Sequence, residues 1–457
     1  MQPDASVLQE DTMNIAIDRE ESYDVVVCGG GTAGFCAAIA AARMGAKTAV
    51  IERFGAFGGT MTVGGVSAPA LFHAHGRQII AGIGWELMTR LAAKGYASLP
   101  PEPYALRHPQ MAVELNAFRA EVEIDRMMQE AGVKPFFHQT VVYAETEGKH
   151  VESILVGTFE GLKRVKAGVY IDCSGDATLC RFAGAQTETS DELQPASLNS
   201  IFENCSHEVT DREHLVKDFH MRVRNGAMDQ HDIWGLNAGA LLTGHGRGRG
   251  ASYEKCYVIN VGNNLNHVYP FNGANAESRT QGEVEGRESI ARVLDWLNGI
   301  NGYENAYVSA CAPTVSARES CRVVGNAYVT GDDYVNGVVP GDSICYSFYP
   351  VDVHRGKDER APLDNVFLEN GKVPGIPYGA LVAQGFDNLM MAGRIISGDR
   401  RAQSAYRVQA SCMATGEAAG TAAAMAIKRG ETIDRLNTSA LRKQLAQNGA
   451  IVPGITQ

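Results

Sequence analysis

One stretch near the N-terminus limits the fold of this chain more than any other. An apolar run, Tyr23–Cys28, leads into a turn with glycine at positions 29, 31 and 34, and this turn opens a helix of small residues. Gly45 ends the helix, and a second apolar run finishes at Glu52. Strand, glycine turn, helix and strand within about 30 residues form a βαβ unit. The unit predicts an α/β fold built on a parallel sheet.

The spacing Gly29-x-Gly31-x-x-Gly34 predicts a dinucleotide site, because each glycine meets a separate physical need. The first permits a tight turn, the second lets backbone N–H groups approach a pyrophosphate, and the third lets the helix pack closely on the strand. The helix N-terminus adds partial positive charge, and the carboxylate of Glu52 can accept both ribose hydroxyls. The alternative is a glycine turn in an ordinary α/β protein. The candidate binding residues of this unit are Gly29, Gly31, Thr32, Ala33, Gly34, Glu52 and Arg53.

Three later segments narrow the choice of dinucleotide. A nicotinamide-dependent dehydrogenase would continue with regular βα units, whereas here the glycine-rich stretch 56–65 follows Glu52 almost at once. Asp172–Asp176 ends a strand about 120 residues later, and Ala392–Arg394 precedes a small-residue helix from about Ser411. Glycines in such a stretch suit backbone that lies flat against a ring system, and the helix N-terminus can aim its dipole at an anionic ring atom.

Together these segments resemble the flavoproteins with two dinucleotide-binding domains. Within them the chain is similar to the bacterial FAD-dependent oxidoreductase family, which is distantly related to the fumarate reductase and L-aspartate oxidase flavoproteins. The matching segments are Tyr23–Gly65, Asn116–Ala185, Arg318–Arg322 and Ile376–Lys428. The family often has a His-Ala segment after the Ala-Gly-Arg motif, and Asp399–Arg407 lacks it here.

The resemblance implies FAD as the cofactor and assigns roles by position. The glycine turn would hold the pyrophosphate, and Glu52 the adenosine ribose. The next glycine-rich stretch would lie beside the flavin, and the two C-terminal segments would reach the ribityl chain and pyrimidine edge. The residues so implied are Gly58, Gly59, Thr60, Gly175, Asp176, Gly393, Arg394, Ala414 and Thr415. A covalent link between flavin and His73 or His75 is left open.

The pattern along the chain predicts several domains. Residues 1–21 are polar and acidic and are expected to form a flexible arm. Residues 22–190 and 376–430 are expected to form a discontinuous, Rossmann-like FAD-binding domain with a parallel sheet and a β-meander. Residues 191–375 are expected to form an inserted α+β substrate domain, and residues 431–457 a helical tail. Helices are expected at 78–95, 116–131 and 411–429, and meander strands at 133–140, 148–158 and 162–167.

Four residues are the best candidates for substrate chemistry. His73 lies in Phe72–Arg77, directly after the flavin loop, where the alternative is a solvated loop. Arg318 opens Arg-Glu-Ser-Cys-Arg, where the alternative is a structural ion pair between Glu319 and either Arg318 or Arg322. His354 follows Asp352 by two residues and suits a proton relay or a structural hydrogen bond. Arg407 precedes the C-terminal cofactor helix and can bind a substrate oxygen or stabilise an anionic flavin.

The amino-acid composition argues against several other classes of protein. Lys and Arg number 41 against 52 Asp and Glu, a net charge of −11, which disfavours nucleic-acid binding. No run of about 18 apolar residues and no signal peptide is found, so no membrane partner is expected. The ten cysteines include no C-x-x-C pair, which predicts no metal site and a reducing, cytoplasmic location.

Assembly into a homo-oligomer is left open. The glycine-rich segment 244–250 is expected to form a mobile loop over the active site or a solvated surface loop.

The sequence thus predicts an enzyme that transfers a hydride between bound FAD and a small polar metabolite. The reaction would be that of a dehydrogenase or oxidase, or of a double-bond reductase in the reverse sense. One alternative is a flavin-binding protein without turnover. Another is an NADH-dependent flavin reductase or disulfide reductase, which would require a second Gly-x-Gly-x-x-Gly turn and usually a C-x-x-x-x-C pair. The sequence contains neither.

Overall fold

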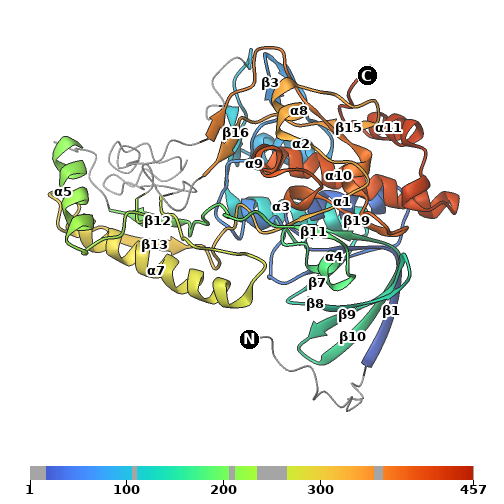
Figure 1. The fold of residues 1–457 in the computed structure, drawn as a ribbon, viewed down its shortest axis with the longest axis horizontal. Coiled ribbons are helices and arrows are strands. Elements are labelled where there is room, and N and C mark those ends of the chain that lie inside the picture. The colour runs from blue at the N-terminus through green and yellow to red at the C-terminus, as the bar shows by residue number, and fades with distance from the viewer. Residues whose placement is uncertain (1–16, 105–110, 205–211, 234–264, 355–363, 456–457) are drawn as a thin grey trace.

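A computed structural model describes residues 17–104, 111–204, 212–233, 265–354 and 364–455. Its centre is a seven-stranded sheet with the strand order β7-β2-β1-β10-β9-β8, in which β19 also pairs with β10. The strands are β1 (Ile17–Cys28), β2 (Thr48–Glu52), β7 (Lys134–Phe137), β8 (Thr140–Glu147), β9 (His150–Thr158), β10 (Gly161–Asp172) and β19 (Leu389–Met391). The predicted α/β fold with a parallel sheet and a meander is confirmed (Figure 1).

The long strand β10 joins the two parts of this sheet. It runs parallel to β1 along its length, while its first residues pair antiparallel with β9 and its last three pair parallel with β19. The meander therefore consists of β8, β9 and β10. The expected meander strand at 133–140 is wrong, because β7 lies parallel to β2 at the opposite edge. A helical crossover precedes β7, and such a crossover returns a chain to a parallel position.

Two predicted boundaries near the N-terminus also need correction. The strand β1 begins at Ile17, so five residues of the expected arm 1–21 belong to the sheet, where they pair with the start of β10. The helix expected at 78–95 is α2 (Ile83–Ala93), because Gly82 has a φ of 77° and lies outside the α region. The helix α3 (Ala117–Ala131) agrees with its prediction, and the side chain of Asn116 accepts from its first turn.

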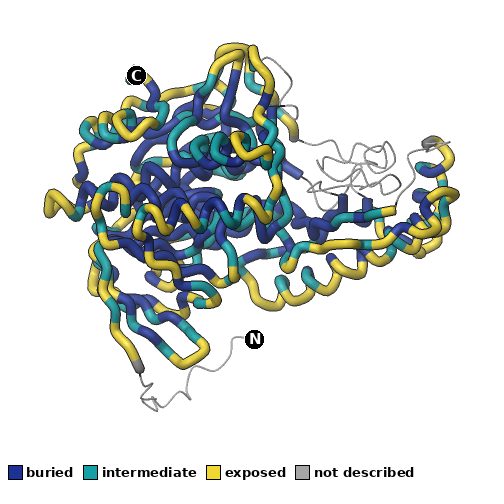
Figure 2. Tube along the Cα trace, turned by 180° about the vertical axis from the view of Figure 1, so that it is seen from behind, coloured by how far each residue is buried: buried dark blue, intermediate teal, exposed yellow. Residues whose placement is uncertain are grey.

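Two buried helices pack against each other and against the central sheet. The helices α1 (Thr32–Arg43) and α10 (Gln409–Arg429) touch at glycines of α10, and both lie in the dark-blue interior of Figure 2. A Cβ atom on Gly416 would lie 2.0 Å from the Ala33 carbonyl oxygen, and one on Gly420 would lie 2.0 Å from that of Ala37. The helix backbones can therefore approach this closely only because both positions lack a side chain.

A second, smaller core lies beside the first. It contains buried residues from Ala196 to Val315, among them members of β12 (Ser200–Glu203), α5 (Arg212–Arg224) and α7 (Ala276–Asn298), and half-buried Val308 of β13 (Tyr307–Cys311) packs against it. In Figure 1, α5 and α7 extend to one side of the main body. Buried residues from Cys321 to Val373 belong to the larger core, so the second core is shorter than the expected domain 191–375. The chain returns to the larger core through β14, which pairs with β11.

The remaining elements surround the larger core. They are η1 (Gly59–Met61), β3 (His73–Ala74), β4 (Arg77–Gln78), β5 (Ala97–Ser98), β6 (Glu114–Leu115), α4 (Thr178–Phe182), β11 (Thr187–Glu188), β14 (Arg322–Val323), α8 (Gly331–Asn336), β15 (Ser343–Tyr346), β16 (Val351–Val353), β17 (Asp364–Val366), β18 (Gly375–Pro377), η4 (Tyr378–Leu381), η5 (Gly393–Ile395), α9 (Arg400–Tyr406), η6 (Ile433–Arg435) and α11 (Thr438–Gln447). Leu441 and Leu445 of α11 are buried in the larger core, so the expected tail packs on it.

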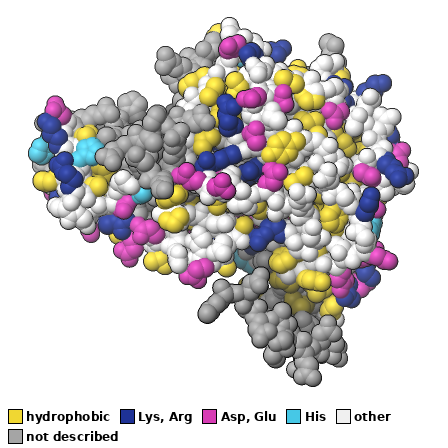
Figure 3. Space-filling view, viewed as in Figure 1, with side chains coloured by type: hydrophobic (Ala, Val, Ile, Leu, Met, Phe, Trp, Pro, Cys, Tyr) yellow, Lys and Arg dark blue, Asp and Glu magenta, His cyan; other side chains and the backbone are white. Residues whose placement is uncertain are grey.

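The described surface carries charges of both signs. On the face shown in Figure 3, basic and acidic side chains are interspersed. Among the helices of the described residues, none is both long and apolar enough to cross a membrane. The segment 244–250, expected to form a loop over the active site, lies outside the described residues.

Candidate cofactor cavity and active site

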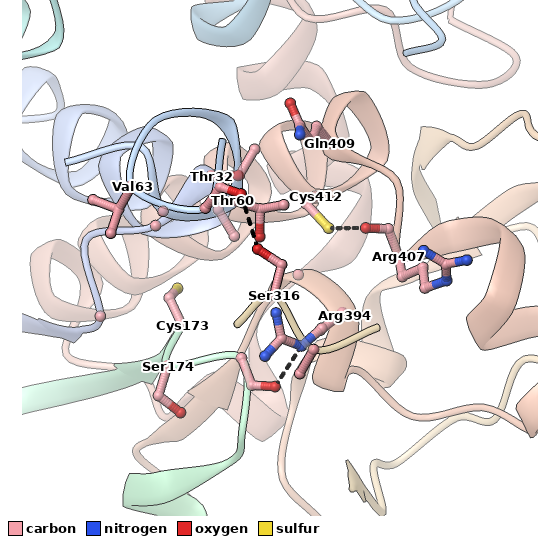
Figure 4. A pocket seen from close by; sticks show the side chains of 18 of the residues that line it. Thr32, Thr60, Val63, Cys173, Ser174, Ser316, Arg394, Arg407, Gln409 and Cys412 are labelled. Carbon is pink, nitrogen blue, oxygen red and sulfur yellow. Dashed lines mark hydrogen bonds between the residues drawn. The ribbon is translucent and has the colours of Figure 1, made fainter. Parts of the chain in front are cut away.

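A cavity of about 340 Å³ lies at the carboxyl ends of β1, β2 and β10. Ligands of open α/β sheets bind at this edge, where the strand order reverses. Both cores contribute to its walls, since Ser197, Arg279 and Thr314 line it together with residues of the larger core. Figure 4 shows side chains from several elements around this space. The predicted site residues that line it are Gly29, Gly31, Thr32, Ala33, Glu52, Arg53, Gly59, Thr60, Gly175, Arg318, His354, Gly393, Arg394 and Arg407.

The glycine turn has the geometry that its sequence predicts. Gly29 has a φ of 99°, and a Cβ atom there would lie 2.6 Å from the Cys173 carbonyl oxygen. A Cβ on Gly34 would lie 1.8 Å from the Gly29 carbonyl oxygen, so Gly34 serves helix packing and does not line the cavity. The position of Gly31 is different, because the nearest atom to its Cβ, the Gly59 Cα, is 3.8 Å away. The space in front of Gly31 is therefore kept open for a ligand rather than filled by protein.

The carboxylate of Glu52 is fixed beside this turn. Its Oε2 accepts from the Gly30 N–H at 2.7 Å and its Oε1 from the Phe54 N–H at 2.9 Å. Burial raises its pKa, and the two N–H donors oppose that shift. A carboxylate has about four acceptor positions, so Glu52 retains the capacity to accept two ribose hydroxyls.

The second glycine-rich segment is attached directly to the first. The Gly58 N–H donates to the Gly30 carbonyl at 2.9 Å, and the Thr32 hydroxyl donates to the Gly58 carbonyl at 3.1 Å. Gly58 has a φ of 100° and lies behind the cavity wall, while Gly59 and Thr60 form the wall. The two segments therefore make one continuous backbone surface.

Asp176 follows the end of β10 as predicted, but it does not line the cavity. Its side chain is buried behind the cavity, where it pairs with Arg394 at 2.9 Å and with Arg279 of α7. Burial alone would raise the pKa of Asp176, but the two guanidinium groups outweigh it and hold the pKa below its usual value. Arg394 also donates from Nε to the Gly175 carbonyl at 2.7 Å. Asp176 thus acts on the cavity through the arginines, and Arg279 is a cavity residue that no sequence motif marks.

At the C-terminal side, the predicted residues lie one turn too far along α10. Ala414 and Thr415 do not line the cavity, whereas Gln409 and Cys412 do. The helix begins at Gln409, two residues before the predicted start, so its first turn reaches the cavity. The Thr415 hydroxyl instead accepts from the Gly393 N–H at 3.1 Å and supports the Ala-Gly-Arg turn from behind.

His73 lies away from the cavity, and its expected place in the active site is wrong. Its ring stacks on Tyr104 with 3.9 Å between centroids and meets Trp85 edge-on at 5.0 Å. Burial lowers its pKa to about 4. His73 begins a short hairpin of β3 and β4 that turns at His75 and Gly76, both with positive φ.

The other three candidates meet at one end of the cavity. His354 Nε2 lies 3.2 Å from Asp352 Oδ2, and Arg407 Nη2 lies 3.6 Å from the same oxygen. Arg318 donates to the Pro195 carbonyl at 2.5 Å and to the Ser197 hydroxyl at 3.1 Å. Burial lowers the pKa of His354 to about 4. Burial would raise the pKa of Asp352, but its bond to His354 and the charge of Arg407 hold it well below the usual range.

Sequence reasoning missed a second histidine in this cluster. His267 Nε2 lies 3.2 Å from His354 Nδ1, and both rings are buried. Its own pKa is lowered well below the usual value by burial and by the charge of Arg318. His267 comes from the second core, 87 positions away from its partner, so nothing local in the sequence indicates the contact.

The Arg318–Arg322 motif divides between two roles. Arg318 lines the cavity, while Arg322 forms a buried ion pair with Glu319 at 2.8 Å. Glu319 also accepts from Ser190 at 2.5 Å and from Arg400 at 3.4 Å. The ion pair expected as the alternative for this motif is thus present with Arg322 as the partner of Glu319, while Arg318 lines the cavity.

The family comparison identifies the cofactor of this chain. The model of the family described as FAD dependent oxidoreductase matches residues 24–445. The chain belongs to the FAD-dependent oxidoreductase family. It is accordingly an FAD-dependent oxidoreductase, and FAD is its cofactor.

Curated relatives of this FAD-dependent oxidoreductase match over short stretches. A dihydrolipoyl dehydrogenase of Trypanosoma brucei brucei is 57% identical over 53 residues, 11% of this chain and 11% of the relative. The mitochondrial dihydrolipoyl dehydrogenase of Pisum sativum is 31% identical over 155 residues, 33% of this chain and 28% of the relative. The matches therefore span less than a third of these relatives.

Solved structures resemble it over most of their length at low identity. A p-nitrophenol 4-monooxygenase of Pseudomonas putida is 10% identical, with 93% of this chain and 83% of that chain covered and a TM-score of 0.46. A geranylgeranyl bacteriochlorophyll reductase-like protein of Thermoplasma acidophilum is 11% identical, with 94% and 84% covered and a TM-score of 0.44.

The cavity of this FAD-dependent oxidoreductase fits its cofactor. The open space at Gly31 lies at the N-terminus of α1, where the cap carries no side chain that could occupy the first N–H groups. These donors suit a pyrophosphate. Glu52 suits the ribose, and the arginines around Asp176 supply positive charge close to the turn.

Proposed function

We propose that this enzyme transfers a hydride between FAD and a small polar metabolite that binds at the end of the cavity lined by Arg318, Asp352, His354 and Arg407. The observation that carries the proposal is that this polar cluster and the glycine turn line the same cavity. One end thus suits the cofactor, while the other offers acids, bases and hydrogen-bond donors of the kind that substrate oxidation requires.

Arg407 is suited to orient a substrate oxygen. Its Nη2 donates to the Asp352 carbonyl at 3.3 Å, which anchors the guanidinium, while its buried Nε has no hydrogen-bond partner among the described residues. Arg407 lines the cavity, so a substrate oxygen there can accept from its guanidinium, which would fix the position of the reacting carbon.

His354 is suited to relay a proton between Asp352, which lines the cavity, and His267. Bound FAD would supply the hydride acceptor or donor. At neutral pH His354 is uncharged, since its pKa is about 4, and Asp352 is ionised. The carboxylate requires a hydrogen on His354 Nε2, so Nδ1 accepts from Nε2 of His267. The N–H groups of His267 and His354 then both point toward the Asp352 carboxylate at the cavity. This series of hydrogen bonds supports proton movement between the substrate and the second core.

Anaerobic bleaching of the bound flavin tests the proposal. Purified holoenzyme is mixed with single hydroxy acids, sugars and amines, and the oxidised flavin absorption is followed. We expect bleaching by at least one class, and we expect the Arg407→Ala variant to bleach at least ~100-fold more slowly at equal FAD content. Retention of FAD without bleaching by any compound would instead support a binding protein without turnover.

NADH serves as the second arm of the same experiment. A flavin reductase would be bleached by NADH alone. A disulfide reductase would in addition need a cysteine pair at the flavin. Cys28, Cys173 and Cys412 line the cavity, and all three are free thiols. Burial raises their pKa values, which disfavours thiolate chemistry.

A further inference from the structure

We propose that both cores hold the cofactor: Arg279, on α7 of the second core, binds a phosphate of FAD, and Asp176 positions it. The inference goes beyond the transfer reaction, because it concerns how the cofactor joins two parts of the molecule. It assigns a binding role to a residue outside every dinucleotide motif of the sequence.

The basic cluster adjoins the glycine turn. A Cβ on Gly29 would lie 2.8 Å from the Ser174 Cα, so the turn rests on the end of β10. The next residue, Gly175, accepts from Arg394 Nε at 2.7 Å, and the one after it, Asp176, pairs with Arg394 and Arg279. Ser174 and Gly175 also line the cavity, so the arginine cluster and the glycine turn both adjoin the segment that follows β10.

The guanidinium of Arg279 is held in a defined orientation. Nε donates to the Gly273 carbonyl at 2.5 Å, and Nη2 pairs with Asp176 Oδ2. A Cβ on Gly273 would lie 2.9 Å from Asp176 Oδ1, so a side chain there would displace the carboxylate. With Nε and Nη2 occupied, the two donors on Nη1 remain for an anion in the cavity that Arg279 lines. A guanidinium that is fixed through Nε and Nη2 and keeps its Nη1 donors available matches the geometry of a phosphate.

Three arginines bring positive charge to the cavity wall at this point. Arg53, Arg279 and Arg394 line the cavity, while the nearby carboxylates Asp176 and Glu283 do not line it. Burial lowers the pKa of Arg279, and Arg53 and Arg394 lower it further although Asp176 opposes them. A phosphate between the arginines would relieve this repulsion and would draw α7 toward the larger core.

The test uses holoenzyme and measures release of FAD by its fluorescence after dilution, at increasing NaCl. We expect Arg279→Ala to release FAD about 10-fold faster or more and to reduce the salt dependence of release. Arg279→Lys should fall between the two, and Asp176→Asn should also accelerate release. Arg287→Ala is the matched control, since Arg287 lies on the same helix with a side chain 60% exposed, and it should release FAD as the wild type does.

Hydrogen exchange of α7 provides the second readout. In the wild type, removal of FAD should lower protection at residues 276–282, and in Arg279→Ala the protection should be low with or without FAD. If Arg279→Ala does not fold, Arg279→Lys and Asp176→Asn decide the matter by the same measurements. FAD release at the wild-type rate would overturn the proposal, even with α7 protection lost, because Arg279 would then only join the two cores.

Discussion

Replacement of Glu417 by Gln should stabilise the enzyme at alkaline pH and leave it unchanged at acid pH. Glu417 lies in the middle of α10 and is buried, and its Oε2 accepts from the Ile83 N–H at 2.8 Å, at the start of α2. Burial raises its pKa from 4.5 to about 7, which the Ile83 N–H and Arg43 only partly offset. The carboxyl therefore binds a proton more readily in the folded chain than in the unfolded one.

The sign and size of the effect on the free energy of unfolding follow from this difference in the pKa of Glu417 between the folded and unfolded chains. Below pH 4.5 the group is protonated in both states and has no effect on stability. As the pH rises from 4.5 to 7 the unfolded chain ionises first, so stability is lost across this window. Each pKa unit corresponds to about 1.4 kcal/mol, which gives a loss of about 3 kcal/mol above pH 7. Gln is uncharged at every pH and can still accept from Ile83, so the variant avoids this loss.

Urea unfolding of the FAD-loaded protein at pH 5, 7 and 8.5 measures the effect. Glu431→Gln is the matched control, because Glu431 is exposed and follows the end of the same helix. We expect the free energy of unfolding of Glu417→Gln to exceed that of the wild type by a margin that grows with pH, while Glu431→Gln follows the wild type. Equal pH dependence in Glu417→Gln and wild type would refute the reasoning.

Three further variants test the site and the helix packing. Gly31→Ala should fold normally but bind FAD at least ~10-fold more weakly in a fluorescence titration, because its Cβ enters the open space at the turn rather than protein. Gly420→Ala should lower the free energy of unfolding by about 1–3 kcal/mol, since its Cβ meets the Ala37 carbonyl; Gly341→Ala, in open space, is the control, and an unchanged urea midpoint for Gly420→Ala would contradict the packing. His354→Gln should slow bleaching by an active metabolite about 100-fold or more with the flavin spectrum intact, and the wild-type rate should fall only as the pH drops toward 4; a wild-type bleaching rate in the variant would exclude a proton-transfer role.

The parts of the site that the sequence predicts are those made by neighbouring residues. Gly29, Gly31 and Glu52 belong to one βαβ unit, and its short-range geometry determines where they lie. Their positions follow from a turn, a helix N-terminus and a strand end, each with its own pattern. The same reasoning predicts the α/β fold and the parallel pairing of β1 and β2.

The residues that sequence analysis missed or misplaced depend on contacts between distant segments. Arg279 and His267 reach the cavity cluster only because the second core packs beside the first, and no periodic pattern encodes that packing. His73 was expected at the flavin because it is near in sequence, but it does not line the cavity. Asp176 has the predicted position at the end of β10, but it acts on the cavity only through its arginine partners, which the sequence does not reveal.

The contact between α1 and α10 also has a consequence for biosynthesis. The glycine turn and α1 leave the ribosome before the helix that covers α1 and reaches the cavity, because that helix begins at Gln409, 377 residues after Thr32. Until then the small-residue face of α1 has no cover, and contacts this distant in sequence form slowly. We therefore expect FAD to be captured after translation, and nascent chains to depend on chaperones while that face is exposed.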